Sequence, residues 1–163
     1  MAVTITIGGA ASDSYATEAE YASYVVANID ATFTADETAD AIVLRRAAQY
    51  IDRKNEASFI GIRQYQTQAL EWPRLTGDLV RGYPVNPDII PQSIKDAQME
   101  LARQIQTGEV APFESVSGVI KSEKLGPMET EYAGGLSTPR LTAINDALRP
   151  YLKAAGQARA VRG

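Results

Sequence analysis

Residues 89–108 read IIPQSIKDAQMELARQIQTG, and this stretch decides the fold class. Pro91 suits the first turn of a helix, where its missing N–H costs no hydrogen bond. Apolar residues then recur at helical spacing on one side, with charged residues on the other: Ile94, Ala97, Leu101 and Ile105 against Lys95, Asp96, Glu100 and Arg103. Gly108 ends the pattern as a C-terminal stop. The stretch predicts an amphipathic helix whose apolar stripe packs against a helix carrying Ile42 and Tyr50.

Residues 68–74, upstream of this helix, read QALEWPR and contain the only tryptophan of the chain. Pro73 pushes the preceding Trp72 toward extended geometry, so Trp72, Pro73 and Arg74 cannot continue a helix. We interpret them as a structural turn between two helical stretches. The interpretation that fits the usual fate of a tryptophan is that Trp72 fills the core. Arg74 then caps a helix end or pairs with a carboxylate.

Capping signals and apolar spacing predict three further helices. Residues 17–20, Thr-Glu-Ala-Glu, form a capping-box pattern that opens a helix to about Asn28. A second cap at residues 34–37 opens a helix to about Lys54, with one face apolar and one polar: Ile42, Val43, Ala47, Tyr50 and Ile51 face inward, and Arg45, Gln49 and Asp52 point away. Pro139 leads into a last helix that Pro150 kinks or splits.

Two segments have the pattern of strands. Residues 3–7 alternate strictly between apolar and polar side chains, which predicts a half-buried strand. Residues 119–124 and 128–132 flank Leu125-Gly126-Pro127 and predict a hairpin with basic residues on one strand facing acidic ones on the other. An isolated hairpin is marginal in water, so its third strand comes from residues 3–7 or from an adjacent subunit. Residues 76–88 are expected to form a loop, and residues 64–70 a short helix or turn.

Together these elements predict a mainly α fold: a small bundle of about four helices with a β-hairpin, which an N-terminal strand could join. The expected domain spans residues 1–155 with the hairpin at 117–133, and a basic tail follows at 156–163. Charge is uneven, because residues 1–139 hold 11 basic and 19 acidic side chains, a net of −8. Residues 140–163 hold five basic and one acidic side chain, a net of +4.

Composition argues against catalysis. The chain has no cysteine and no histidine, which removes disulfides, thiolate or imidazole metal sites and Ser-His or Cys-His nucleophile pairs. The carboxylates Asp36, Glu37 and Asp40 are better explained by the positive end of a helix dipole than by acid–base chemistry. We therefore expect no enzyme activity, no catalytic residues, no metal and no cofactor. No run approaches the roughly 18 apolar residues of a membrane span, so we expect no membrane partner and synthesis in the cytoplasm.

The chain resembles the head–tail connector proteins of tailed bacteriophages, also called adaptor or neck proteins. The resemblance is carried by the QAL segment running into Trp72-Pro73-Arg74, the Gly77-Asp78 loop and the helix that follows Pro91. The Ser-Tyr-Ala-Thr opening at residues 14–17 and the hairpin near residues 119–132 fit as well. Some relatives carry the label of DnaT-like single-stranded-DNA-binding proteins. The motifs are structural and not catalytic.

The resemblance implies a structural virion protein that forms a homo-oligomeric ring, expected to be a dodecamer, under the portal protein. Its other implied partners are a tail terminator or the next neck protein, and double-stranded DNA that passes without sequence-specific binding. It implies a place in the neck of the virion, after assembly in the host cytoplasm. Portal contacts are expected from Lys153, Arg159, Val161 and Arg162. Contacts between subunits, or with the lumen, are expected from Lys121, Glu123, Lys124, Glu129 and Glu131.

Single-stranded-DNA binding is the alternative hypothesis from the sequence. In that case Trp72, Tyr65 and Tyr83 would stack on bases, and Arg63, Arg74 and Arg81 would contact phosphates. An acidic body repels phosphate, which favours the connector interpretation. The basic C-terminal segment is open to two interpretations. It either suits the end of a helix or contacts an acidic partner.

Overall fold

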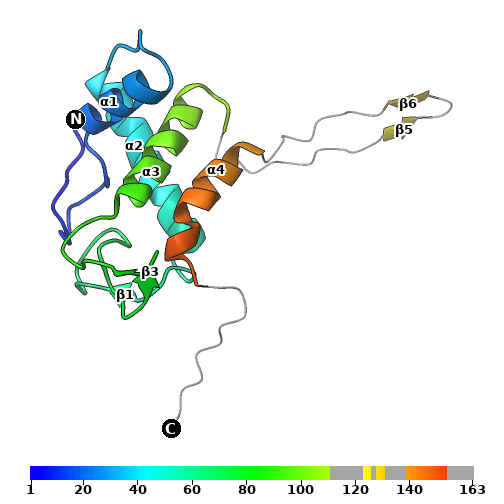
Figure 1. The fold of residues 1–163 in the computed structure, drawn as a ribbon. Helices are drawn as coiled ribbons and strands as arrows, with labels where there is room; N and C mark the ends of the chain where they lie inside the picture. Colours follow the sequence, from blue (N-terminus) through cyan, green and yellow to red (C-terminus); the bar gives the residue numbers. More distant parts are fainter. Residues whose placement is uncertain (111–122, 126–127, 131–138, 154–163) are drawn as a thin grey trace.

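The computed structural model describes residues 1–110, 123–125, 128–130 and 139–153. Within these residues the chain forms four α-helices: α1 (Glu18–Asn28), α2 (Glu37–Asn55), α3 (Gln92–Gln106) and α4 (Pro139–Leu148). Figure 1 shows α3 in the middle of the helical body, beside α2 and α4. The mainly α fold with about four helices is therefore confirmed. The expected boundary at residues 155 and 156 lies outside the described residues.

Helix α1 begins as its sequence predicts. The Thr17 hydroxyl accepts a hydrogen bond from the Glu20 N–H at 3.1 Å, and the Glu20 carboxylate accepts one from the Thr17 N–H at 2.8 Å. This reciprocal capping box satisfies two amide groups that the first turn would otherwise leave without a partner. Tyr21 and Val25 are the residues that α1 buries.

Helix α2 begins two residues later than the cap pattern at residues 34–37 predicts, because Asp36 is the N-cap and its carboxylate accepts from the Thr38 and Ala39 N–H groups. Its buried face is broad: Asp40, Ala41, Val43, Leu44, Ala47, Ala48, Ile51 and Asn55. Two predictions for this helix are wrong. Ile42 is 49% exposed, because the covered face lies on the other side of the helix. Asp52 does not point into solvent but lies beneath residues 71–74.

Helix α3 is confirmed as an amphipathic helix that packs against α2. Pro91 is its N-cap rather than its first helical residue, and Gly108 follows the helix with a φ of 71°, a left-handed conformation that glycine adopts without strain. Ile94, Ala97 and Leu101 are buried against the core as expected. Polar Gln98 is also fully buried, since α3 contacts α1, α2 and α4 and has few uncovered positions.

The expected N-terminal strand is not formed by residues 3–7. Two N–H groups of this segment donate to side chains instead of to a neighbouring strand. Thr4 N–H donates to the Asp13 carboxylate at 2.7 Å, and Thr6 N–H donates to the Ser12 hydroxyl at 2.8 Å. Because side chains satisfy these amides locally, the apolar alternation does not lead to a sheet.

Residues 56–91 connect α2 to α3, and we call residues 59–91 of this connection the connecting lobe. It contains two very short antiparallel pairs: β1 (Ile62–Arg63) with β2 (Arg74–Leu75), and β3 (Leu79–Val80) with β4 (Tyr83–Pro84). Residues 76–88, expected to be a loop, therefore include a tight hairpin, while residues 64–70 form turns and no helix. Arg81 and Gly82 both have positive φ, which closes this hairpin in two residues.

The predicted second hairpin is present in its central part as β5 (Glu123–Leu125) and β6 (Met128–Thr130). Lys124 pairs with Glu129, and Glu123 pairs with Thr130, so a basic position faces an acidic one as expected. Lys121 and Glu131 lie outside the described residues. Figure 1 shows β5 and β6 well apart from the four helices, so residues 3–7 do not supply their third strand.

Helix α4 ends at Leu148, and a 3-10 turn, η1 (Arg149–Tyr151), follows with Pro150 inside it. The predicted split at Pro150 is confirmed. The chain then pairs with the connecting lobe: Ile60 N–H donates to Tyr151 C=O at 3.0 Å, and Lys153 N–H donates to Ser58 C=O at 2.7 Å. These bonds fix the end of α4 against the start of the lobe. Across the described residues, no helix is long and apolar enough to cross a membrane.

Candidate functional site

The Trp72-Pro73-Arg74 turn is the first candidate, and the structure places its indole inside the protein. Trp72 is 2% exposed. Its ring meets Phe59 edge-to-face at a centroid distance of 5.7 Å and Tyr151 at 5.3 Å. It thereby joins the connecting lobe to the end of α4, and the Trp72–Pro73 peptide bond is cis. A base could not stack on this ring without opening the core.

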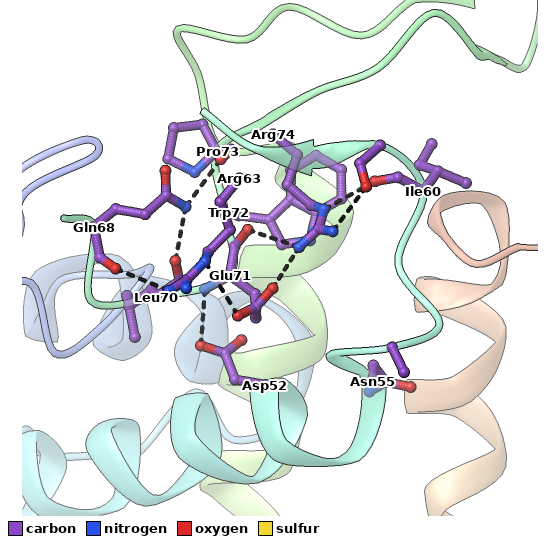
Figure 2. Close-up of polar contacts among 12 residues, drawn as sticks. Asp52, Asn55, Ile60, Arg63, Gln68, Leu70, Glu71, Trp72, Pro73 and Arg74 are labelled. Atoms are coloured by element: carbon purple, nitrogen blue, oxygen red, sulfur yellow. Dashed lines mark hydrogen bonds and ion pairs between the residues drawn. The ribbon is translucent and has the colours of Figure 1, made fainter. Parts of the chain in front are cut away.

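Arg74 is buried beside the indole, and its guanidinium is bound within the chain (Figure 2). Nε donates to Ile60 C=O at 2.8 Å, Nη2 donates to Gly61 C=O at 2.9 Å, and Nη1 forms an ion pair with the Glu71 carboxylate. The expected structural role, pairing with a carboxylate, is confirmed. A guanidinium that binds two carbonyls and a carboxylate in this way has no geometry left for a phosphate.

Gln68 holds the same turn from its other side. Its side-chain nitrogen donates to Leu70 C=O at 2.7 Å and to Pro73 C=O at 3.0 Å. Its side-chain oxygen accepts from the Tyr65 N–H at 2.9 Å. Within the Gln-Ala-Leu segment, the Gln68 side chain therefore stabilises the turn that follows it, as Figure 2 shows.

Below the turn, α2 contributes a largely buried carboxylate. Asp52 accepts a hydrogen bond from the Glu71 N–H at 3.1 Å and another from the Tyr15 hydroxyl. Burial raises the pKa of Asp52 to about 6, although both hydrogen bonds favour the ionised form. Burial, followed by the negative charge of Asp52, raises the pKa of Tyr15 well above its ordinary value. This closed network ties the N-terminal segment, α2 and the turn together.

The outer surface of the connecting lobe differs from its interior. Six large apolar or aromatic side chains are exposed there: Ile62, Tyr65, Leu75, Leu79, Tyr83 and Ile89. Ile62 and Leu75 are direct cross-strand partners, so they lie together on the β1–β2 pair. Tyr83 and Ile89 line a shallow groove of about 400 Å³ that reaches Tyr151. Exposed apolar side chains that lie together, as these two pairs do, are typical of contact sites for other macromolecules.

The six residues proposed to bind single-stranded DNA do not form one surface. Trp72 and Arg74 are buried, as described above. Tyr65 is 46% exposed, but one side of its ring lies against Gly8, where an added Cβ would sit 2.3 Å from the ring. Arg63 is half exposed and donates to Gln68 C=O at 3.2 Å. Arg81 and Tyr83, on the β3–β4 hairpin, remain open to solvent.

Of the expected portal contacts, Lys153 is described and the other three lie outside the described residues. Its ammonium donates to Ala57 C=O at 2.8 Å, so its charge lies at the exposed junction between the C-terminal end of α2 and η1. Among the expected hairpin contacts, Glu123, Lys124 and Glu129 lie on the β5–β6 pair. No group of three or more His, Cys, Asp or Glu side chains within the described ranges is placed to hold a metal ion.

Sequence reasoning missed Gln98 and Asp52. Gln98 binds two backbone amides and one carbonyl in the core, and Asp52 binds the turn. A signal for Gln98 was present, because it lies four residues after Ile94 and three before Leu101, on the apolar face of α3. A polar residue on such a face needs buried partners. Asp52 offered no comparable signal, since the element that covers it is distant in sequence.

The fold and these contacts define a small helical protein whose Trp72-Pro73-Arg74 turn is structural and whose connecting lobe exposes large apolar side chains. A protein-family model described as "Putative DnaT-like ssDNA binding protein" matches residues 1–163. The chain belongs to this family. No curated protein and no solved structure matches the chain. The family description agrees with the alternative hypothesis from the sequence and says nothing of a head–tail connector.

Proposed function

We propose that this chain is a structural assembly protein: a ring-forming head–tail adaptor that docks under a portal and links a DNA-filled capsid to a tail. The observation that carries the proposal is the contrast between the interior of the connecting lobe and its surface. Its aromatic and cationic motif, Trp72 to Arg74, is buried and bound inside, whereas several large apolar side chains, such as Ile62, Leu79 and Ile89, are exposed on its surface. A lobe built in this way is suited to contact protein and poorly suited to hold phosphates.

Charge supports the same function. A net of −8 over residues 1–139 repels the phosphate backbone, which a nucleic-acid-binding surface must attract. Repulsion is useful to a protein that lines a channel, because DNA must pass through without adhering. We assign no sequence-specific DNA contact to the chain. Its proposed place is the virion neck, after assembly in the host cytoplasm. A tail terminator or the next neck protein would bind the side of the ring that faces away from the portal.

Two segments are proposed to make the assembly contacts: the hairpin and the C-terminal tail. Lys121, Glu123, Lys124, Glu129 and Glu131 are proposed to contact a neighbouring subunit or the lumen, since the hairpin has no helix beside it (Figure 1). Lys153, Arg159, Val161 and Arg162 are proposed to contact the portal. A weak basic contact repeated around a ring gains affinity from multivalency.

Truncation tests the portal assignment. Removing residues 156–163 should leave the melting temperature of the helical body nearly unchanged and abolish co-purification with the portal at moderate salt. The matched control is a chain of full length in which Arg159 and Arg162 are both changed to lysine, which keeps the charge and should keep most of the binding. Undiminished portal binding by the truncated chain would refute the tail assignment.

Deleting residues 121–131 and closing the gap with a short turn tests the hairpin. We expect a folded helical body, by circular dichroism and thermal melt, that no longer completes particles in an assembly reaction. A deletion variant that fails to fold would show that the hairpin belongs to the core of its own subunit. A folded variant that still completes particles would remove the hairpin from the assembly surface.

Single-stranded-DNA binding is the second candidate, supported by the family description and by one local feature. Tyr83 is 76% exposed, and Arg81 lies in the two-residue turn just before it, so an aromatic face and a cation are available close together. Titration of a labelled single strand at several salt concentrations tests it, because phosphate binding must weaken steeply with salt. Tyr83→Ala should then cost about tenfold in affinity, with Tyr50→Ala, on α2, as the matched control. The absence of binding at low salt would reject this candidate.

A further inference from the structure

One face of α2 carries a stripe of exposed residues that the core does not use. Ile42, Arg46, Gln49 and Arg53 follow one another at spacings of four, three and four residues, which places them in one row along the helix. Ile42 is 49% exposed. Arg46 has no hydrogen bond or ion pair with any described residue. On a body with a net charge of −8 over residues 1–139, this row is a local concentration of positive charge.

A groove of about 520 Å³ lies between α1 and α3 and has the opposite character. It is lined by Ala19, Glu20, Ser23, Tyr24, Asn28, Gln92, Asp96 and Met99. Glu20 is neutralised by Lys95 at 2.7 Å, but the partner of Asp96 is the uncharged Gln92 amide at 2.8 Å. Burial, and then the negative charges of Glu100 and Asp96, raise the pKa of Tyr24. The groove is therefore acidic, with apolar surface from Tyr24 and Met99.

The stripe and the groove point in opposite directions. Gln98 of α3 donates to Leu44 C=O of α2 at 2.9 Å, so Gln98 and the fully buried Leu44 mark the contact between the two helices. Residues two positions apart on a helix are turned by about 200°. Arg46 therefore lies on the side of α2 away from α3, and Asp96 lies on the side of α3 away from Leu44. Different surfaces facing opposite ways are what a head-to-tail ring contact requires.

We propose that the α2 stripe of one copy of this chain binds the α1–α3 groove of the next copy, with Arg46 directed at Asp96 and Ile42 against the apolar part of the groove. This inference rests on the proposed ring-forming function and names the contact that builds the ring. The occupant is a second copy because the chain itself supplies the complementary charge. Each copy offers one stripe and one groove, so the contact repeats until the ring closes.

Charge reversal tests the contact, with assembly followed by light-scattering mass, alone and with the portal. Arg46→Glu and Asp96→Arg should each abolish assembly. The double variant Arg46→Glu/Asp96→Arg should restore it. An equimolar mixture of the two single variants should also assemble, because the reversed stripe of one fits the reversed groove of the other. Arg149→Glu, an exposed arginine outside both surfaces, is the matched control and should assemble as the wild type does.

The outcomes separate this contact from the ring-forming function. A wild type that assembles, together with single variants that assemble equally well, would overturn the contact and leave the function standing. Loss of assembly with Asp96→Arg but not with Arg46→Glu would also overturn it and would assign the groove to another basic segment, such as residues 140–163. A wild type that stays monomeric at every concentration, alone and with the portal, would overturn both.

Discussion

The Gln98 side-chain oxygen accepts a hydrogen bond from the Tyr15 N–H at 3.0 Å, across 83 positions of sequence. The same oxygen accepts from the Ala16 N–H at 3.0 Å, and the side-chain nitrogen donates to the Ser14 hydroxyl at 2.7 Å and to Leu44 C=O at 2.9 Å. One fully buried amide thus joins the N-terminal segment, α2 and α3. Each of these groups would otherwise be a polar atom in the core without a partner.

Replacing that amide tests its role. Gln98→Met keeps the length of the side chain but leaves buried backbone groups unpaired, and each such group costs about 1–3 kcal/mol. We expect a large fall in the free energy of unfolding, measured by urea denaturation. Gln92→Met, at an exposed position of the same helix, is the matched control and should change little. Equal stability of the two variants would show that water replaces the Gln98 contacts.

Leu101→Ala tests the core face of α3. Leu101 is fully buried, so its truncation should lower the free energy of unfolding by about 2–5 kcal/mol. Leu79→Ala removes the same atoms from a side chain that is 64% exposed and should stay within about 0.5 kcal/mol of the wild type. A thermal melt of the Leu101 variant that matches the wild type would contradict the packing described here.

Trp72→Ala should destabilise the protein by about 3–5 kcal/mol, because the indole fills the space between Phe59 and Tyr151. The loss should appear in chemical denaturation of the protein without any partner. If this variant kept full stability and lost affinity for single-stranded DNA, the indole would be a binding residue and the structural assignment would fail.

Arg74→Ala should cost about 1–3 kcal/mol through the Ile60 and Gly61 carbonyls and the Glu71 carboxylate that it leaves without a partner. Arg63→Ala is the matched control, because Arg63 approaches the same Glu71 carboxylate at 3.8 Å but is half exposed. Its effect should be below about 1 kcal/mol. The order of the two effects, measured by urea denaturation, is the test: a larger loss for Arg63→Ala would contradict the network in Figure 2.

Asp52 makes stability depend on pH in a direction opposite to that of most carboxylates. Its pKa is about 6 in the folded protein, against about 3.9 for an unfolded aspartate, so between these values the folded state binds more protons. Its contribution to stability is therefore present below about pH 4 and is lost as pH rises to about 6 and above, a change of roughly 3 kcal/mol. Asp52→Asn removes this titration. The stability difference between wild type and Asp52→Asn should move in favour of the variant as pH rises from 4 to 7, and a constant difference would contradict the raised pKa.

The elements that the sequence predicted correctly are those specified by neighbouring residues. Thr17 and Glu20 are three positions apart, so the start of α1 depends on contacts within one turn. Gly108 ends α3, and Pro150 splits the last helix, through backbone restrictions that act on the same or adjacent residues. Lys124 pairs with Glu129, which is only five positions away in the sequence.

The tertiary structure decided which side chains are buried and which are exposed. Periodicity gives a helix an apolar side, but whether Ile42 lies inside or outside depends on where α3 packs. The alternation of residues 3–7 could not reveal that Asp13 and Ser12 would bind its amides. From the sequence alone, a nucleic-acid contact remained an alternative for Trp72 and Arg74. In the fold, Phe59 and Tyr151 pack on the indole and the Ile60 carbonyl binds the guanidinium. Burial depends on contacts between segments that are far apart in the sequence, and local sequence patterns do not predict those contacts.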